Sequence, residues 1–161
     1  SLENQTSDPN WEDTEWSTAN MLCFNARMKE TEKSYEWLQN LFRRFMRENL
    51  MTVSPAGIAL AEYDIFSFDA NEAAVAGMCE MLIQCYDDQV EFLPALPSEW
   101  KDGNVKGICI FDGIVVDMEW NDGNMKSATM ASRKKDVEIK VKGITNPVKI
   151  GKGETKRLKF T

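Results

Sequence analysis

The chain has 161 residues, a formal net charge of -7 at pH 7, 43% hydrophobic residues and 28% charged residues. This balance is typical of a folded globular protein with one or two small domains, and no apolar run is long enough to span a bilayer. The acidic charge disfavours a phosphate backbone, so nucleic acid is not an expected partner.

Histidine is absent from the chain, and the four cysteines have no paired spacing. Cys23, Cys79, Cys85 and Cys109 therefore do not form the common zinc motifs, and catalysis by a histidine base is excluded. On a helix, a spacing of six residues directs Cys79 and Cys85 to different faces, so no local disulfide is expected between them. We expect the thiols to behave as small buried apolar side chains, and we expect no metal and no cofactor.

Three helices are predicted after a flexible N-terminus over residues 1–10. The first runs from about Thr14 to Arg27 and the second begins near Thr31, and both carry apolar residues at spacings of three and four. The stripe predicted to be buried on the first helix contains Trp16, Ala19, Asn20, Cys23 and Ala26.

The third helix, predicted over about Ala70 to Tyr86, is apolar nearly all round. Such a helix belongs in the interior of a larger body, so we expect that chain outside this sequence covers it. Self-association through the exposed apolar helix over residues 70–86 is the alternative way to cover it.

After Asp87-Asp88 the apolar pattern changes from a period of about 3.6 residues to a period of about 2, which indicates strands. Asp112-Gly113 and Asp122-Gly123 supply tight hairpin turns. The expected strands are Val105–Phe111, Ile114–Trp120, Met125–Ala131, Val137–Val141, Val148–Ile150 and Arg157–Phe160. The predicted fold class is α+β, with a helical segment over residues 11–88 and an antiparallel β-sheet or sandwich domain over residues 89–161.

Asp69 is the first candidate for chemistry, because carboxylates activate water or donate protons in sugar hydrolysis, and Asn71 beside it could hold a water or a hydroxyl. Asp69 followed by Glu72 also fits an N-cap with a reciprocal acidic residue, and spacing alone favours this capping role. The two roles are not exclusive. A capping carboxylate that accepts amide hydrogen bonds stays ionised, which suits a base better than an acid. Glu62, Asp64 and Glu72 are weaker candidates, since acids near loops are usually only solvated.

Tryptophans suggest a function of another class, a non-catalytic carbohydrate-binding or structural β-domain, because indole rings can stack on sugars. The candidates are Trp16, Trp37, Trp100 and Trp120. Trp120 alternates with predicted core residues of a strand and Trp37 adjoins an apolar helix stripe, so packing is the favoured interpretation. Burial of Phe111, Trp100 and Trp120 would indicate a structural role.

A set of ordered segments stands at distances that match one known family. They are Trp16-Ser17, Asn25-Ala26-Arg27-Met28, the loop from Ala56 to Asp69, Ala76-Gly77-Met78-Cys79-Glu80-Met81-Leu82-Ile83-Gln84, Leu93-Pro94-Ala95-Leu96-Pro97, Trp100 and Asp102-Gly103-Asn104-Val105-Lys106-Gly107. From about Trp16 to Gly143, the chain resembles the C-terminal end of glycoside hydrolase family 95, the family of inverting α-L-fucosidases with some α-L-galactosidases.

The resemblance implies a barrel of six α-helical hairpins around the active site, followed by a small β-domain, of which this chain would hold the closing helices and the β-domain. It implies that Asp69 helps to activate water together with upstream asparagines that this chain does not contain, and that an upstream glutamate is the general acid. We expect Asn71 to assist Asp69. No residue here matches that glutamate, so we expect the chain alone to be inactive. The implied substrate is an α-L-fucosyl or related α-L-galactosyl glycan, and the implied location is periplasmic or extracellular.

The chain departs from the family pattern around the expected site. The family usually has Asp-Gly-Asn-Phe-Gly where this chain has Asp69-Ala70-Asn71-Glu72-Ala73, and it has a histidine where Tyr63 stands. Because glycine permits close approach of backbone to a ligand, Ala70 and Glu72 are expected to reshape the pocket. These changes imply a different sugar, or weak or absent fucosidase activity.

Overall fold

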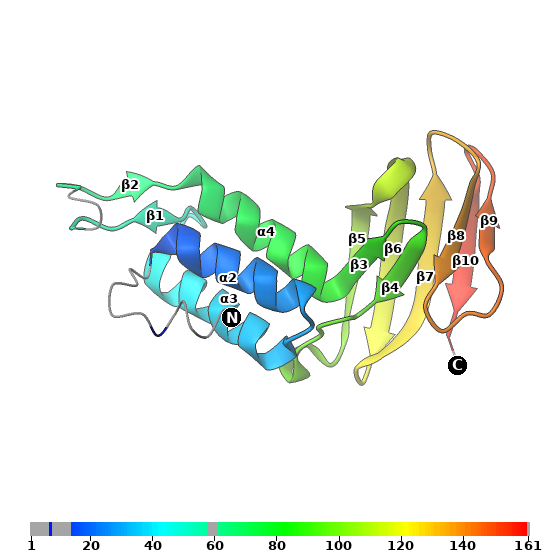
Figure 1. The fold of residues 1–161 in the computed structure, drawn as a ribbon, viewed down its shortest axis with the longest axis horizontal. Helices are drawn as coiled ribbons and strands as arrows, with labels where there is room; N and C mark the ends of the chain where they lie inside the picture. Colours follow the sequence, from blue (N-terminus) through cyan, green and yellow to red (C-terminus); the bar gives the residue numbers. More distant parts are fainter. Residues whose placement is uncertain (1–6, 8–13, 58–60, 161) are drawn as a thin grey trace. The chain divides into compact units, whose positions relative to one another are not determined.

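The computed structural model describes Ser7 and residues 14–57 and 61–160 (Figure 1). The chain divides into two compact units, residues 1–81 and 82–161. Apart from Ser7, the flexible end expected over residues 1–10 lies outside the described residues. No helix in the described part is long and apolar enough to cross a membrane.

The described residues of the first unit form three helices and a short β-hairpin. The helices are α2 (Glu15–Arg27), α3 (Thr31–Phe45) and α4 (Phe68–Leu82), and the hairpin pairs β1 (Val53–Ser54) with β2 (Ile65–Phe66). Helix α2 begins with a capping box in which Thr14 and Ser17 exchange hydrogen bonds between side chain and backbone. The buried cluster that joins the three helices consists of Ala19, Leu41, Phe45, Ala70 and Ala74. The first two predicted helices are confirmed: both ends of α2 and the start of α3 lie within one residue of the expected positions.

The Leu22 side chain of α2 packs directly onto Gly77 of α4. A Cβ atom added to Gly77 would lie 2.5 Å from Cγ of Leu22, a side chain that is fully buried. Near this contact, the thiol of Cys23 donates a hydrogen bond of 3.2 Å to the carbonyl of Ala73. Packing therefore explains why a glycine occurs within helix α4: the absence of a Cβ at Gly77 makes room for the Leu22 side chain.

The buried face of α2 differs from the predicted stripe. Ala19 and Ala26 are buried as predicted, but Trp16 is 57% exposed and Phe24 is 49% exposed. The buried face runs through Thr18, Leu22 and Asn25 instead, which turns Trp16 and Phe24 toward the outside. The prediction that Trp16 belongs to the buried stripe is wrong.

The predicted end of the third helix is also wrong. Helix α4 ends at Leu82, and β3 (Ile83–Tyr86) pairs antiparallel with β4 (Gln89–Phe92) across a turn in which Asp87 has φ of 51°. Ile83 and Cys85 pack in the core of the second unit, a pattern with period two. Strand pairing therefore overrides the helical pattern from Ile83 onward.

The second unit is a β-sandwich of two four-stranded sheets. One sheet has the order β10-β7-β6-β5 and the other has the order β3-β4-β8-β9. The remaining bounds are β5 (Gly103–Cys109), β6 (Ile114–Asn121), β7 (Asn124–Ser132), β8 (Val137–Val141), β9 (Val148–Ile150) and β10 (Thr155–Lys159), with 3-10 turns η2 (Ser98–Trp100) and η3 (Phe111–Gly113). The strand positions predicted from β5 to β10 are confirmed to within a few residues.

Side chains from both sheets form the core of the sandwich. The cluster includes Val116 and Met130 from one sheet and Val90, Ile139 and Ile150 from the other. The prediction of purely antiparallel strands is wrong at one place, because β4 and β8 run parallel. The α+β class is confirmed, and the described residues show helices and a mixed β-sandwich rather than a whole six-hairpin barrel.

Candidate functional site

Asp69 lies in the first turn of α4 and its side chain is exposed. Its predicted capping role is wrong, because the helix begins one residue earlier, at Phe68. Ser67 fixes this start: its N–H donates to the carbonyl of Thr52 at 2.9 Å, and its carbonyl accepts the Thr52 hydroxyl at 2.7 Å. These bonds continue the β1–β2 pairing to the edge of the helix. Among the described residues, no group bonds to the Asp69 carboxylate, which leaves it open to a ligand.

Asn71 holds the neighbouring turn in place. Its Oδ1 accepts the backbone N–H of Thr52 at 2.8 Å and the Thr52 hydroxyl at 2.9 Å, while its Nδ2 donates to the carbonyl of Leu50 at 2.9 Å. Thr52 itself is fully buried. Asn71 therefore binds the segment before β1 to the same helical turn that carries Asp69.

Exposed aromatic side chains precede Asp69 in the chain. Phe66 and Phe68, on either side of buried Ser67, are 47% and 58% exposed and meet edge to face with 6.3 Å between ring centroids. Tyr63, in the same loop, is 76% exposed. An acid beside open aromatic rings can bind a sugar, because the rings offer apolar faces while the carboxylate accepts hydroxyl hydrogens. Sequence analysis missed the two phenylalanines, although their alternation about Ser67 is visible.

A second acid near this loop is already engaged. The Asp64 carboxylate forms an ion pair with Arg47 and accepts the backbone N–H of Ala56 at 3.1 Å. The hydrogen bond from Arg47 lowers the pKa of Asp64 below its usual value, and the bond from the Ala56 amide adds to this effect. Asp64 therefore stays ionised and is a poor proton donor.

Two departures from the family pattern, Ala70 and Glu72, lie in different environments. Ala70 is fully buried in the cluster that joins the three helices, so the expectation that it reshapes a ligand pocket is wrong. Its methyl group fills space between helices instead. Glu72 is exposed, one helical turn after Asp69 on the same face. Of the two changes, only Glu72 adds a group beside the candidate carboxylate.

The described residues contain no cluster of three or more acidic, cysteine or histidine side chains that could hold a metal. All four cysteines are free thiols. Burial raises the pKa of Cys23 and of Cys79, and the negative charge of Glu80 raises both further. Cys109 is exposed, so the expectation that every thiol is buried is wrong for that residue.

The tryptophans of the β-sandwich serve packing. Trp120 is 6% exposed, and its indole N–H donates to the carbonyl of Trp100 at 2.7 Å. Gly103 makes room for this indole, since an added Cβ would lie 2.3 Å from Cζ2 of Trp120. Trp100 and Phe111 are half-buried against the cores of this unit. These three rings therefore do not form the open aromatic platform expected of a sugar-binding sheet.

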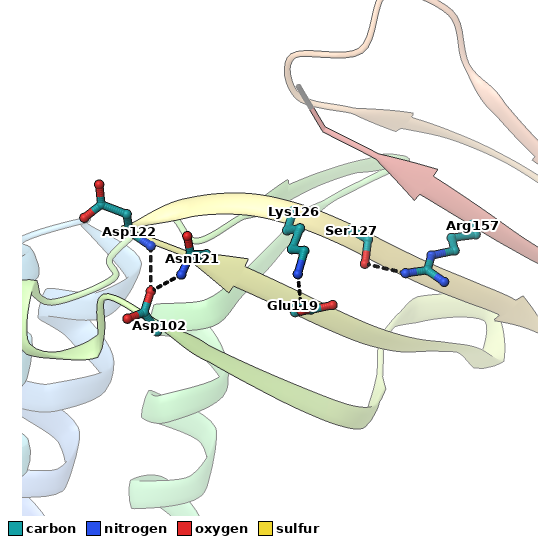
Figure 2. A network of polar contacts seen from close by, with 7 residues as sticks. All are labelled: Asp102, Glu119, Asn121, Asp122, Lys126, Ser127 and Arg157. Carbon is teal, nitrogen blue, oxygen red and sulfur yellow. Dashed lines mark hydrogen bonds and ion pairs between the residues drawn. The ribbon is translucent and has the colours of Figure 1, made fainter.

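Asp102 supports the same region of the sandwich. Its Oδ1 accepts the Asn121 side-chain amide at 2.6 Å and the Asp122 backbone N–H at 2.7 Å, which fixes the turn between β6 and β7 (Figure 2). Trp100, Asp102 and Gly103 are among the residues that carry the family resemblance. In the structure they hold the β-domain together rather than a reacting group.

Two family models match consecutive parts of the chain. The glycosyl hydrolase family 95 catalytic domain matches residues 1–82, and the glycoside hydrolase family 95 C-terminal domain matches residues 84–161. The chain is also similar to Alpha-L-fucosidase 2 of Arabidopsis thaliana, with 29% identity over 116 residues that cover 65% of this chain and 13% of that relative. Because the catalytic-domain model matches half of the chain and the C-terminal model matches most of the remainder, the chain belongs to glycoside hydrolase family 95.

Proposed function

We propose that this chain provides the water-activating half of an inverting glycoside hydrolase, with Asp69 as the base. The observation that carries the proposal is the exposed Asp69 carboxylate in the first turn of α4, which no described residue bonds and which directly follows the exposed rings of Phe66 and Phe68 in the chain. An ionised carboxylate can accept the proton of a water molecule as that water attacks the sugar.

Asn71 assists in this proposal by positioning. Its three hydrogen bonds fix the segment before β1 against the turn that carries Asp69. Because these bonds hold the turn in a fixed position, the carboxylate can stay correctly placed for a water molecule that attacks the substrate. Asn71 also retains one amide hydrogen beyond the bond to Leu50, and that hydrogen can be donated to a water or a sugar hydroxyl.

The chain alone is proposed to be inactive. Inversion needs a second carboxyl group about 6.5–9.5 Å from the first, acting as a general acid. Asp64 is unsuited to this role because its pKa is lowered by Arg47. The general acid is proposed to come from catalytic-domain sequence outside this chain, in keeping with the 13% share of the similar plant protein that is aligned.

The exposed apolar side chains of the first unit support the same proposal. Trp16, Phe24, Phe68 and Val75 are each about half exposed or more, on α2 and α4. Isolated soluble domains rarely leave many large apolar side chains open, and such surfaces commonly bind other protein segments. We propose that further catalytic-domain helices cover them. Self-association through α4 is the competing proposal, and sedimentation of the purified chain distinguishes a dimer from a monomer.

The proposed substrates are glycans with terminal α-L-fucosyl residues, as the name of the similar plant protein suggests, or with related α-L-galactosyl residues, as the family resemblance implies. A periplasmic or extracellular location belongs to the same proposal, because such glycans are found there. Cell fractionation of an organism that expresses the longer protein would test the location.

The test of inactivity uses the purified chain and 2′-fucosyllactose. No fucose release is expected from the chain or from Asp69→Asn, with Glu72→Gln as a matched change of a neighbouring acid. Hydrolysis by the chain that disappears only in Asp69→Asn would show that it is complete as an enzyme, and would overturn the proposal that the acid lies outside it.

A further inference from the structure

The outer face of the sheet formed by β5, β6, β7 and β10 is polar along its length. Adjacent strands place Asn104 opposite Glu119, Glu119 opposite Ser127, and Thr129 opposite both Asp117 and Arg157. Between these positions, the alternate residues Met118, Ala128 and Leu158 point into the core of the sandwich. The sheet thus presents rows of hydrogen-bonding side chains on its other face.

This face is hollowed into an open groove of about 430 Å³. The polar side chains that line it are Asn104, Lys106, Asp117, Glu119, Thr129 and Arg157, together with Ser127. Ligand-binding clefts have volumes of about 300–1,000 Å³ and are usually lined by apolar groups. A groove of this size with a polar lining favours a ligand covered with hydrogen-bonding groups.

The charges of the groove are partly paired with one another. Lys126 donates to Oε1 of Glu119 at 2.8 Å, and Arg157 donates to the Ser127 hydroxyl at 3.3 Å, as Figure 2 shows for residues from β6, β7 and β10. The Lys126 hydrogen bond lowers the pKa of Glu119, and the positive charge of Arg157 contributes in the same direction. The groove therefore holds an ionised carboxylate beside a guanidinium group.

Several groups in the groove remain available for a ligand. The Oδ1 atom of Asp117 accepts the N–H of Gly107 at 2.8 Å, which leaves its other oxygen for a further donor. Among the described residues, the side chains of Asn104 and Lys106 make no hydrogen bond or ion pair. Arg157 uses one of five N–H donors in its single long bond to Ser127. Open donors and open acceptors thus occur side by side.

The balance of charge selects the class of ligand. Two cationic groups, Lys106 and Arg157, line the groove with two anionic groups, Asp117 and Glu119, so the lining itself has no excess charge, and Lys126 lies outside the lining, bound to Glu119. An anion would gain from the cations but would be repelled by both carboxylates. A sugar hydroxyl both donates and accepts hydrogen bonds, so a pair of neighbouring hydroxyls can use a carboxylate and a guanidinium together.

We propose that this groove is a second carbohydrate-binding site, distinct from the Asp69 site, that takes a neutral saccharide through its hydroxyl groups. Asp117 and Glu119 accept hydroxyl hydrogens, while Arg157, Lys106 and Asn104 donate to hydroxyl oxygens. The site would hold a glycan on the C-terminal domain without cleaving it. The choice of a fucosylated probe rests on the proposed function, but the site itself is argued from the groove alone.

Nuclear magnetic resonance titration of the whole chain tests the proposal. The probes are lactose and 2′-fucosyllactose as neutral sugars, and dextran sulfate as an anionic polysaccharide. Saturable shifts of the Ser127 and Thr129 amide signals are expected with at least one neutral sugar, and these shifts should change little when salt is added. Because the readout is binding and not hydrolysis, the result is independent of whether Asp69 acts as a base.

Two variants that should leave the fold intact test whether the sugar binds in the groove. Arg157→Ala removes only one long hydrogen bond, and Asp117→Asn keeps the acceptor for Gly107 while replacing the second carboxylate oxygen. Each is expected to weaken neutral-sugar binding about tenfold, as loss of a hydrogen bond to a charged group implies. Lys149→Ala, on β9 in the other sheet, is the matched control and should leave binding unchanged.

Three results would overturn the proposal. They are the absence of saturable shifts with both neutral sugars at their highest soluble concentrations, binding of dextran sulfate alone with loss in high salt, and equal weakening by Lys149→Ala and Arg157→Ala. The second result would assign the groove to polyanions instead.

Discussion

Replacement of Gly77 by alanine tests the close packing of α2 and α4. The added Cβ would lie 2.5 Å from Cγ and 2.7 Å from Cδ2 of Leu22, and ordinary contact begins at 3.4 Å. The leucine must therefore move by about 0.9 Å, and it is fully buried. Overpacking of this kind costs about 1–3 kcal/mol, whereas alanine gains about 1 kcal/mol over glycine in a helix. We expect Gly77→Ala to destabilise the first unit by about 1 kcal/mol.

Urea unfolding followed by circular dichroism at 222 nm measures this effect, because the α-helices of the described chain lie almost entirely in the first unit. Ala76→Gly, at an exposed position on the same helix, is the matched control and should cost about 1 kcal/mol through helix propensity alone. In a Leu22→Ala background, which removes the obstructing atoms, Gly77→Ala should instead stabilise the chain. If Gly77→Ala stabilises the chain in the presence of Leu22, the packing argument is refuted.

Three further predictions concern the loop near Asp69 and the β-sandwich. Asn71→Ala removes three hydrogen bonds of the segment before β1 and should cost about 1–3 kcal/mol in urea unfolding; an unchanged free energy would contradict its anchoring role. Gly103→Ala places a Cβ 2.3 Å from Trp120, so we expect a loss of about 1–3 kcal/mol and a fluorescence change from the displaced indole, and neither should be seen if the ring can move freely. Arg47 lowers the pKa of Asp64 in the folded chain, so the ion pair stabilises the fold above the unfolded-state pKa of this acid and is lost as pH falls through the folded-state pKa; in a carboxyl titration by nuclear magnetic resonance, Arg47→Gln should raise the midpoint toward the ordinary value, and an unchanged midpoint would argue against the pair.

Local patterns in the sequence predict most of the secondary structure. Turn residues such as Asp122-Gly123 fix hairpins between neighbours in the chain, and the spacing of apolar residues on α3 matches its buried face. The end of α4 is a different case, because the apolar run into Ile83 suits a helix or a strand equally well. Pairing of β3 with β4 selects the strand. This pairing and the parallel pairing of β4 with β8 both depend on contacts between distant residues, which no local sequence pattern contains.

The candidate site shows the same division. Asp69 and Asn71 are visible as a carboxylate beside an amide at the start of a helix, but their partners are not. The bonds from Asn71 to Leu50 and Thr52 join residues about 20 positions apart. The burial of Ala70 depends on how three helices pack, so a change that suggests an altered pocket in the sequence proves to be a core contact in the structure.

Asp69 is proposed to activate water for hydrolysis with inversion. The most direct measurement follows the anomeric form of fucose released from 2′-fucosyllactose by proton magnetic resonance, using a longer protein that contains this chain and its Asp69→Asn variant. We expect the first product to be β-L-fucose, the inverted form, and we expect release to fall at least about a hundredfold in the variant, in keeping with loss of a general base. Release of α-L-fucose first, or full activity in Asp69→Asn, would contradict the account.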